Sequence, residues 1–348
     1  MKRMNWLGGF ALIMILSVSL VVPAMAEDNE KEIGVWNNDV ELGLNILQST
    51  YSKNWNGGEK GSIVWTGNLN AQFEKQMSEK INWRNTLKLV YGQTHQQDRS
   101  TNGDLHWKKP SKTDDIIDFE SLFRWTPESG WDPFVSLTFT SMFEDLSDGA
   151  GRSQSFNPIT LKESAGISRP WIDSEDRKLM TRLGVAAIQN SRSFFTEDAP
   201  STATISESST ELAAELITEY SVGALDGRVD WDSKLTLSMP FMYSGKSTFE
   251  DNLALMTAAG LDNDVADYTT TVDVDWENTF TANITKVISV KLLVRWVYDK
   301  YDNTVAPVVG KDSVGADALL NSSDVENAIR KTGQFKQTLA LGLTYKFM

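Results

Sequence analysis

The chain has 348 residues, a formal net charge of −14 and no cysteine. The lack of cysteine excludes a disulfide framework, a thiolate metal site and acylation of a lipoprotein cysteine. The acidic charge balance argues against a protein that binds nucleic acid.

The first 26 residues have the pattern of a secretory signal. Lys2 and Arg3 precede an apolar run, and the small residues Ala24 and Ala26 come just before acidic residues. The apolar run is short and ends at Pro23, which favours cleavage after Ala26 over a retained anchor helix. Because this segment carries two basic and no acidic residues, the mature chain has a net charge of −16.

Apolar and polar residues alternate in about twelve segments of the remaining chain. Alternation with a period of two predicts strands that have one apolar face. These segments are longer than the usual ~5–6 residues of a soluble strand and suit a tilted bilayer crossing of ~9–11 residues. The expected strands are 38–51, 62–75, 81–95, 115–126, 132–144, 158–171, 178–193, 211–222, 228–244, 268–283, 287–301 and 334–348.

Short and long connections alternate along this series. Short links follow the even-numbered strands, and long polar segments such as 96–115, 194–210, 245–267 and 302–333 follow the odd-numbered ones. This organisation predicts an all-β protein: a transmembrane, antiparallel, up-and-down barrel of about 12 strands with short periplasmic turns and long extracellular loops. The expected organisation is a cleaved signal peptide (1–26), a short N-terminal segment (27–37) and an integral outer-membrane barrel (38–348).

Aromatic residues gather near both ends of the expected strands, where a bilayer has its two interfaces. A soluble β-sandwich or a lipocalin-like barrel would explain the alternation but neither the aromatic girdles nor the unequal loops. The aromatic residues expected near the periplasmic interface are Trp83, Trp125, Trp171, Tyr220, Trp231, Tyr345 and Phe347; those expected near the outer interface are Tyr51, Trp65, Tyr91, Phe143, Tyr243, Tyr268, Trp296 and Tyr298.

One residue disagrees with the alternating pattern: Glu163 falls on the apolar face of its strand, which suggests a bulge or a register error.

The last expected strand runs to the end of the chain with a regular apolar face. Pairing with the first strand would close the barrel and leave neither edge free. Its terminal residues Tyr345 and Phe347 resemble the assembly signal of outer-membrane proteins, although Met348 follows the final aromatic. The predicted partners are therefore outer-membrane lipid, the barrel-assembly machinery and periplasmic chaperones.

The stretch from Tyr51 to Gln93 contains an N-W-x-x-G-G pattern, formed by Asn54, Trp55, Gly57 and Gly58, ahead of a strand pair. It resembles the N-terminal signature of an uncharacterised family of outer-membrane β-barrel proteins, a domain of unknown function. The resemblance covers the first three strands and implies a barrel in the cell envelope. It brings no substrate and no catalytic residue.

If the apolar face meets lipid, the charged residues on the other face line the lumen. Acidic residues concentrate on three neighbouring strands and basic residues on others, which predicts two opposed walls and a transverse field. The acidic wall is Glu211, Glu215, Glu219, Asp230, Asp232, Asp273, Asp275 and Glu277; the basic residues are Arg84, Lys88, Arg124, Lys162, Arg182, Lys291 and Arg295.

These residues predict a non-enzymatic channel or passive transporter for small polar solutes, with no cofactor, metal or nucleic acid. Two alternatives stay open. The charges could pair across the lumen and plug it, which would leave a structural barrel acting through its extracellular loops. A phospholipase-like enzyme is disfavoured, because only His95 and His106 are available as a base and neither has a recognisable nucleophile partner.

The long loops carry two helix signals. Ser323 and Glu326 match a capping box, which predicts a short helix within 323–331. An apolar cluster predicts another helix across Phe249 to Ala259. The acidic residues Asp262, Asp264 and Asp267 lack the glycine and the closing Glu of an EF-hand loop, so we interpret them as a solvated loop rather than a calcium site.

Overall fold

The computed structural model describes residues 32–51, 60–102, 104–127, 130–174, 176–195, 199–225, 227–285, 287–312 and 314–347. For residues 345–347 only the backbone is described. The expected signal peptide, the residues Asn54, Trp55, Gly57 and Gly58 of the family pattern, and the side chains of Tyr345 and Phe347 lie outside this set.

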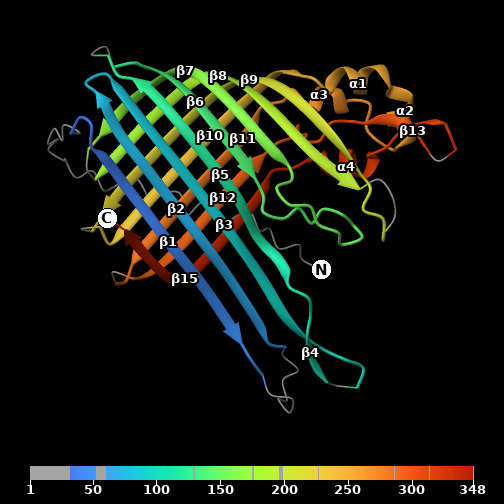
Figure 1. Ribbon diagram of the computed structural model, residues 1–348, viewed down its shortest axis with the longest axis horizontal. Helices are drawn as coiled ribbons and strands as arrows, with labels where there is room; N and C mark the ends of the chain where they lie inside the picture. The colour runs from blue at the N-terminus through green and yellow to red at the C-terminus, as the bar shows by residue number, and fades with distance from the viewer. Residues whose placement is uncertain are drawn as a thin grey trace, which may run out of the picture. The chain divides into compact units, whose positions relative to one another are not determined.

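Twelve long strands pair in antiparallel fashion, each with its neighbours along the ring, and close into a barrel (Figure 1), which confirms the predicted fold class. Two short additions lie outside the ring: β4 (Leu105–Trp107) extends the extracellular end of β3, and β13 (Val309–Lys311) pairs with β14 (Asp317–Leu319). The barrel strands are β1 (Trp36–Ser49), β2 (Ser62–Ser78), β3 (Ile81–Arg99), β5 (Ser111–Trp125), β6 (Asp132–Ser141), β7 (Ile159–Asp173), β8 (Arg177–Phe195), β9 (Thr204–Ala224), β10 (Val229–Tyr243), β11 (Asp273–Asn283), β12 (Ile288–Tyr298) and β15 (Gln334–Phe347).

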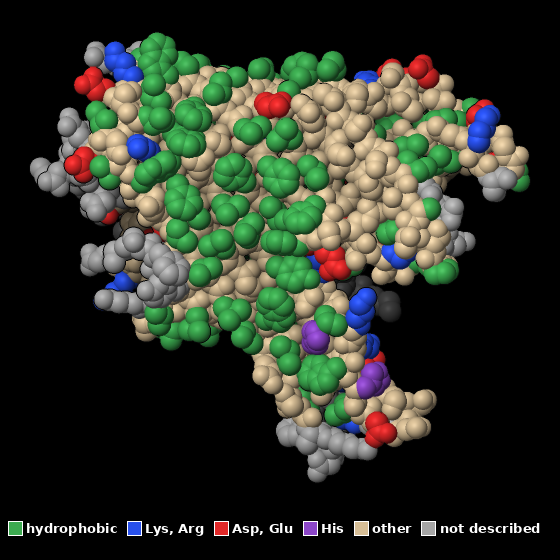
Figure 2. Space-filling model, in the orientation of Figure 1, with side chains coloured by type: hydrophobic (Ala, Val, Ile, Leu, Met, Phe, Trp, Pro, Cys, Tyr) green, Lys and Arg blue, Asp and Glu red, His purple; other side chains and the backbone are tan. Residues whose placement is uncertain are grey.

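The apolar face of the strands points outward. On β8, Leu183 and Val185 are 51% and 56% exposed, whereas on β9 the polar residues Glu211 and Glu215 are buried. Figure 2 shows hydrophobic side chains spread over the outer wall. An outward apolar face is the reverse of a soluble sandwich or lipocalin and matches a barrel whose surroundings are hydrocarbon.

Aromatic residues contact one another at both ends of the outer wall. Near the short turns, the rings of Trp83 and Phe123 stack with centroids 5.1 Å apart. Near the long loops, the rings of Trp65 and Tyr91 lie 5.9 Å apart. These contacts join neighbouring strands, so each girdle also helps to hold the strand register.

Two residues that we assigned to the outer girdle lie elsewhere. A bulge between Pro240 and Met242 shifts the register of β10 by one residue, which turns Tyr243 inward, where it is only 4% exposed. Tyr268 lies in a helix between β10 and β11 rather than in a strand. The period-two rule failed at Tyr243 because a single inserted residue reverses the face of everything after it.

At Glu163 we expected an irregularity of the strand, and the structure has none there. The strand β7 passes through it without a bulge, in register with Leu137 of β6 and Ala187 of β8. Its carboxylate is exposed on the outer wall, where Gln189 donates a hydrogen bond to it at 3.4 Å. The expectation of a bulge at Glu163 is therefore wrong; the irregularity of β7 lies further on, between Pro170 and Ile172.

The barrel closes through β1 and β15, but over part of their length only. Six residues of β1, Val40 to Asn45, pair with Phe347 to Gly342 of β15. By contrast, β1 pairs with β2 through all of its 14 residues. The expectation that neither edge remains free thus holds for the periplasmic half of this seam and not for the extracellular half.

Two extracellular segments, residues 244–272 and 299–333, fold together into a small domain that we call the cap. It contains α1 (Lys246–Asp251), α2 (Leu253–Ala258), α3 (Val265–Tyr268), the β13–β14 hairpin and α4 (Ser322–Ala328). The helices agree with both helix predictions, although α4 begins at Ser322 with Asn321 as its N-cap and makes no side-chain capping bond. None of the described helices is long and apolar enough to span a membrane.

The cap has a hydrophobic core of its own. Phe249, Met256 and Val265 of the first segment are each 1% exposed, and they share one buried cluster with Tyr301 and Val325 of the second. The inward-turned Tyr243 joins this cluster, and its hydroxyl donates to the backbone carbonyl of Val305 at 3.0 Å. The bulge in β10 therefore ties the cap to the barrel wall.

Candidate functional site: the charged lumen

The charged residues that we predicted to line the lumen lie on the strand face opposite the apolar outer wall. They do not form two separate walls, however. Most of them make direct ion pairs, and several of the partners come from strands that the sequence-based division left out.

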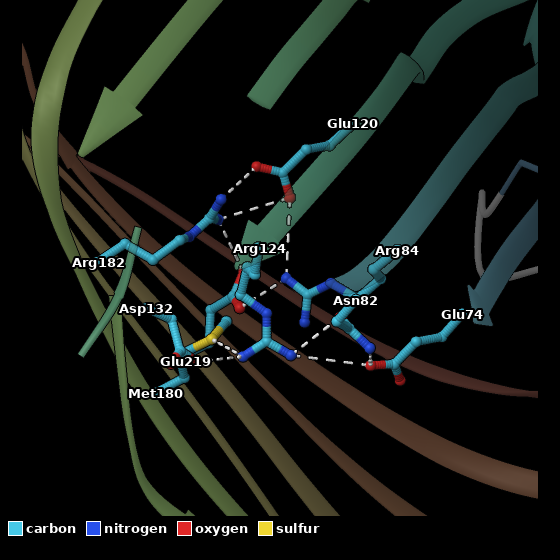
Figure 3. Close-up of polar contacts among 9 residues, drawn as sticks. All are labelled: Glu74, Asn82, Arg84, Glu120, Arg124, Asp132, Met180, Arg182 and Glu219. Atoms are coloured by element: carbon cyan, nitrogen blue, oxygen red, sulfur yellow. Dashed lines mark hydrogen bonds and ion pairs between the residues drawn. The ribbon is translucent and has the colours of Figure 1, made fainter. Parts of the chain in front are cut away.

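The central feature is a chain of ion pairs across the periplasmic half of the barrel (Figure 3). Arg84 Nη2 of β3 lies 2.9 Å from Glu219 Oε2 of β9, two strands that stand five places apart in the ring of twelve. Glu219 Oε1 also lies 3.1 Å from Arg182 Nη2 of β8, and Arg182 Nη1 lies 2.6 Å from Glu120 Oε1 of β5. These residues, which we call the lumen network, therefore span the barrel from wall to wall.

A second group of side chains extends the lumen network toward the periplasmic end. Arg124 Nη2 donates to Asn82 Oδ1 at 3.0 Å, and Asn82 Nδ2 donates to Glu74 Oε1 at 3.0 Å. The Arg124 guanidinium also lies 3.7 Å from Asp132 and 3.9 Å from Glu74. Each charged group here faces an opposite charge, which is the condition under which buried ions are tolerated.

Burial of the lumen network is deep. Arg182 is 2% exposed, Asn82 1%, and Glu74 and Glu120 are 5% and 7% exposed. A barrel of this strand number has a narrow interior that side chains can fill. The lumen network thus narrows the lumen at this level.

Further ion pairs cross or line the lumen outside the lumen network. Lys88 of β3 contacts Glu277 of β11 at 2.7 Å, again five places apart in the ring. The remaining pairs are Lys162 with Glu215 at 2.7 Å, Arg295 with Asp275 at 2.7 Å, Lys291 with Glu41, and Lys336 with Asp114. Asp230 and Asp232 instead accept hydrogen bonds from Asn283 and Ser221.

Five of the acidic partners were missed in the sequence. Glu41, Glu74, Asp114, Glu120 and Asp132 come from strands near the N-terminus, which we had treated as neutral or basic. Strand alternation does place Glu41, between outward-facing Val40 and Leu42, on the lumen side. The sequence therefore did indicate Glu41 as a lumen residue. We did not include it, because the acidic residues are more concentrated on strands β9 to β11.

Some donors in the lumen network have no protein partner. The Nε atoms of Arg84, Arg124 and Arg182 are buried and, within the described residues, find no hydrogen-bond acceptor in the protein. Buried polar groups in proteins are normally satisfied by protein or water. These three atoms are therefore unsatisfied polar groups in the interior of the lumen network.

A pocket at the periplasmic rim adjoins the lumen network at Glu74. This cavity has a volume of about 270 Å³ and is lined by residues of the N-terminal segment and of β1 and β2, including Trp36, Glu74 and Gln76. Glu74 belongs both to the cavity lining and to the lumen network. A small solute in the cavity would thus meet the charged side chains directly.

At the extracellular end the cap is fastened to the inner wall by two asparagines. Asn303 Nδ2 donates to Glu211 Oε2 of β9 at 2.6 Å, and Ser209 Oγ donates to the backbone carbonyl of Asn303 at 2.7 Å. Asn321 Nδ2 donates to Glu207 Oε2 of the same strand at 2.7 Å. The cap therefore covers the β8–β9 side of the extracellular mouth.

The two histidines lie toward the extracellular end, His95 on β3 beyond Lys88 and His106 on β4. The ring of His95 is 6.5 Å from that of Trp107, while His106 is exposed on β4. No group of three or more His, Asp or Glu side chains in the described part of the chain is arranged to hold a metal ion. In the cap, Asp262 and Asp267 pair with Lys331 and Lys246.

Residues 46–145 match the model of a family described as a protein of unknown function, DUF3078. The predicted resemblance to an uncharacterised domain family is thereby confirmed. No curated protein sequence matches the chain.

Several solved outer-membrane barrels are similar in fold. An outer membrane channel from Pseudomonas putida F1 is 9% identical, with 93% of this chain and 100% of that chain covered and a TM-score of 0.39. The β domain of the Bordetella autotransporter Brka is 10% identical, with 90% and 99% covered and a TM-score of 0.34. The translocator domain of the autotransporter NalP from Neisseria meningitidis is 9% identical, with 90% and 87% covered and a TM-score of 0.32. The chain is a twelve-stranded transmembrane β-barrel whose residues 46–145 match an uncharacterised family.

Proposed function

We propose that the protein is a non-enzymatic channel of the outer membrane that passes small polar solutes and rests in a closed conformation. The observation that carries this proposal is the lumen network, in which Arg84, Glu219, Arg182 and Glu120 join opposite walls. The proposal includes export through a cleaved signal and assembly by the barrel-assembly machinery through the last strand.

The choice of charged rather than apolar side chains favours a channel over a purely structural barrel. Filling a barrel with ion pairs carries a desolvation cost, and well-packed apolar side chains of similar volume stabilise a protein at least as well. Paired charges, in contrast, can exchange partners with a passing ion or dipolar solute. The pocket beside Glu74 at the periplasmic rim supports access of a solute to these charges.

Single-channel recording in planar bilayers tests this proposal. The wild-type protein should conduct rarely, and the double variant Arg84→Ala with Glu219→Ala should conduct far more often, because it removes the contact between opposite walls. Glu120 and Arg182 remain paired in this variant, so no charge is left alone in the lumen. The matched control is Lys311→Ala with Asp317→Ala, which removes an exposed ion pair of 2.7 Å in the cap hairpin.

A second function is favoured by the cap, which has its own hydrophobic core and hides part of the mouth. A barrel that acts through this extracellular domain would not need an axial path. Absence of current from both the wild type and the Arg84–Glu219 variant, in protein shown to be folded, would favour this second function and reject the channel.

A further inference from the structure

The extracellular half of the seam between β1 and β15 is unpaired. Within the described residues their ladder ends at Asn45 and Gly342. In the same register, Ile46 to Ser49 would face Leu341 to Thr338, yet β1 continues there paired only with β2, and β15 only with β12. Four missing pair positions at about 3.4 Å each leave a gap of roughly 13 Å along the strands.

Side-chain exposure confirms that the two strands separate at this point. Leu42 and Leu44, on the paired part of β1, are 45% and 42% exposed, whereas Leu47 is 70% exposed although it lies on the lumen face. On the opposite edge, Leu339 is also 70% exposed. Figure 1 shows the end of β1 projecting toward the lower right, away from the part of β15 that pairs with β12.

The lumen face beside the gap carries both apolar and charged side chains. Leu47 stands on one edge, and its register partner on β2 is Val64. On the other side, Leu293 and Val297 of β12 lie on the lumen face, in register with Thr338 and Gln334 of β15. The same stretch of that face of β12 also carries Lys291 and Arg295, which are in register with Ala340 and Lys336 of β15 and pair with Glu41 and Asp275. An acyl chain at the gap would therefore contact Leu47, Val64 and Leu293, while the neighbouring cations already have carboxylate partners.

An open edge of this kind needs an occupant. In hydrocarbon, each unpaired backbone group costs several kcal/mol, so lipid-exposed sheet edges are normally absent. A strand from another chain would need ~9–11 residues to cross the bilayer, many more than the gap offers. A lipid fits better, because its polar head can bond to the free edges while its acyl chain contacts the leucines on both sides.

We propose that the gap between β1 and β15 is a lateral portal through which the acyl chain of an outer-leaflet lipid enters the lumen. The portal lies in the extracellular half of the barrel, away from strand β9, to which the two cap asparagines bind. It goes beyond the proposed channel function and does not depend on it, since entry from the side needs no path through the lumen network.

Photocrosslinking tests the portal directly. Protein in phosphatidylcholine vesicles that contain phosphatidylcholine with a diazirine near the end of one acyl chain is irradiated, and the labelled residues are mapped by mass spectrometry. We expect label on the lumen-facing Leu293 and Val297 as well as on the outer wall. Absence of label on both lumen residues would overturn the proposal, whatever the conductance of the protein.

A clamp across the gap provides the decisive comparison. Because the chain contains no cysteine, Leu47→Cys with Ala340→Cys introduces a unique pair that can be joined by oxidation or, across a wider gap, by a bis-maleimide. The joined protein should lose the label on Leu293 and Val297, and reduction of the disulfide should restore it.

The matched control joins Leu44→Cys to Leu343→Cys, which are already in register on the outer face. This clamp should leave the label on the two lumen residues unchanged. Equal labelling with and without the clamp between positions 47 and 340 would show that lipid does not enter there. A dimer joined through the cysteine introduced at position 47, together with no lumen label, would mean that a second copy occupies the seam, and it would likewise overturn the portal.

Discussion

Whether a residue faces the lipid or the lumen determines how strongly its substitution affects the stability of this barrel. Leu235 and Lys234 are adjacent on β10 but belong to the apolar outer wall and to the lumen face. Leu235 is in register with Thr218 and Trp276, and Lys234 with Glu219 and Glu277. Substitution of each residue by arginine therefore compares the effect of this side chain on the lipid-facing wall with its effect on the lumen face.

We expect Leu235→Arg to destabilise the barrel by about 2–4 kcal/mol, the cost of a cation on the lipid face near mid-depth. Lys234→Arg should have a much smaller effect, because it retains the charge beside two carboxylates. Urea unfolding in lipid vesicles, followed by tryptophan fluorescence, measures both. Equal tolerance of the two arginines would contradict the facing described here.

Asp299, which follows β12 at the base of the cap, gives the cap a dependence on pH. Burial and repulsion from Asp302 raise the pKa of Asp299 from 3.8 to about 7, although Arg330 opposes the shift. A carboxyl whose pKa is raised by folding favours the folded cap fully below about pH 4, and this contribution is lost as the pH rises toward 7.

Hydrogen exchange of cap amides, corrected for intrinsic rates, should therefore show more frequent opening at pH 8 than at pH 5. Asp299→Asn should reduce this difference, since an amide does not titrate and Arg330 keeps its 2.7 Å contact with Asp302. A wild-type cap with the same protection at both pH values would argue against this role of Asp299.

At the level of elements, the cap can be loosened without opening the barrel wall. Phe249 is 1% exposed in the cap core, and its truncation to alanine should cost about 3–5 kcal/mol of cap stability. Leu253→Ala is the control, because Leu253 is 46% exposed on the neighbouring helix. Proteolysis should cut the Phe249→Ala cap faster while the strands stay protected; equal cleavage of both variants would exclude a packed cap.

The sequence predicts the strands far better than it predicts the cap. Each barrel strand has an alternating pattern of its own, so all twelve are predictable, and the short turns limit the errors in their ends. The cap core instead joins two loops separated by β11 and β12, a contact that no local period reveals. Tyr243 was misplaced for a related reason: one bulge residue, invisible in composition, decides which side it faces.

For the lumen, alternation predicts which residues point inward but not what they touch. The pair of Arg84 and Glu219 depends on which strands stand opposite in the closed ring. Strand number and stagger set that geometry. A division into acidic and basic walls was consequently the most that charge along the sequence could indicate.

For the whole molecule, closure of the ring predicts resistance to detergent. The folded protein should fractionate with outer membranes and migrate differently on gels before and after heating, because paired strands in a closed barrel stay folded in detergent. Recovery from the soluble periplasmic fraction would contradict both the fold and the proposed location.

The ion pairs also predict how selectivity responds to neutral substitutions. Changing Glu215, Asp232 and Asp275 to their amides would leave Lys162 and Arg295 without their partners at 2.7 Å. In a salt gradient the reversal potential should move toward anion preference, and the shift should shrink at high salt through screening. An unchanged reversal potential at low salt, in a variant that conducts, would place these carboxylates off the path.

The cap is built from two segments that are distant in the sequence, and this implies an order of steps in assembly. Its core joins residues 249–265 to residues 301–325, which the β11–β12 hairpin brings together, so we expect the core to form after that hairpin. Contacts across such a long stretch of chain form late, since the intervening chain must first be ordered. During biogenesis the mouth therefore stays uncovered while the wall is built, and its covering is among the last steps of folding.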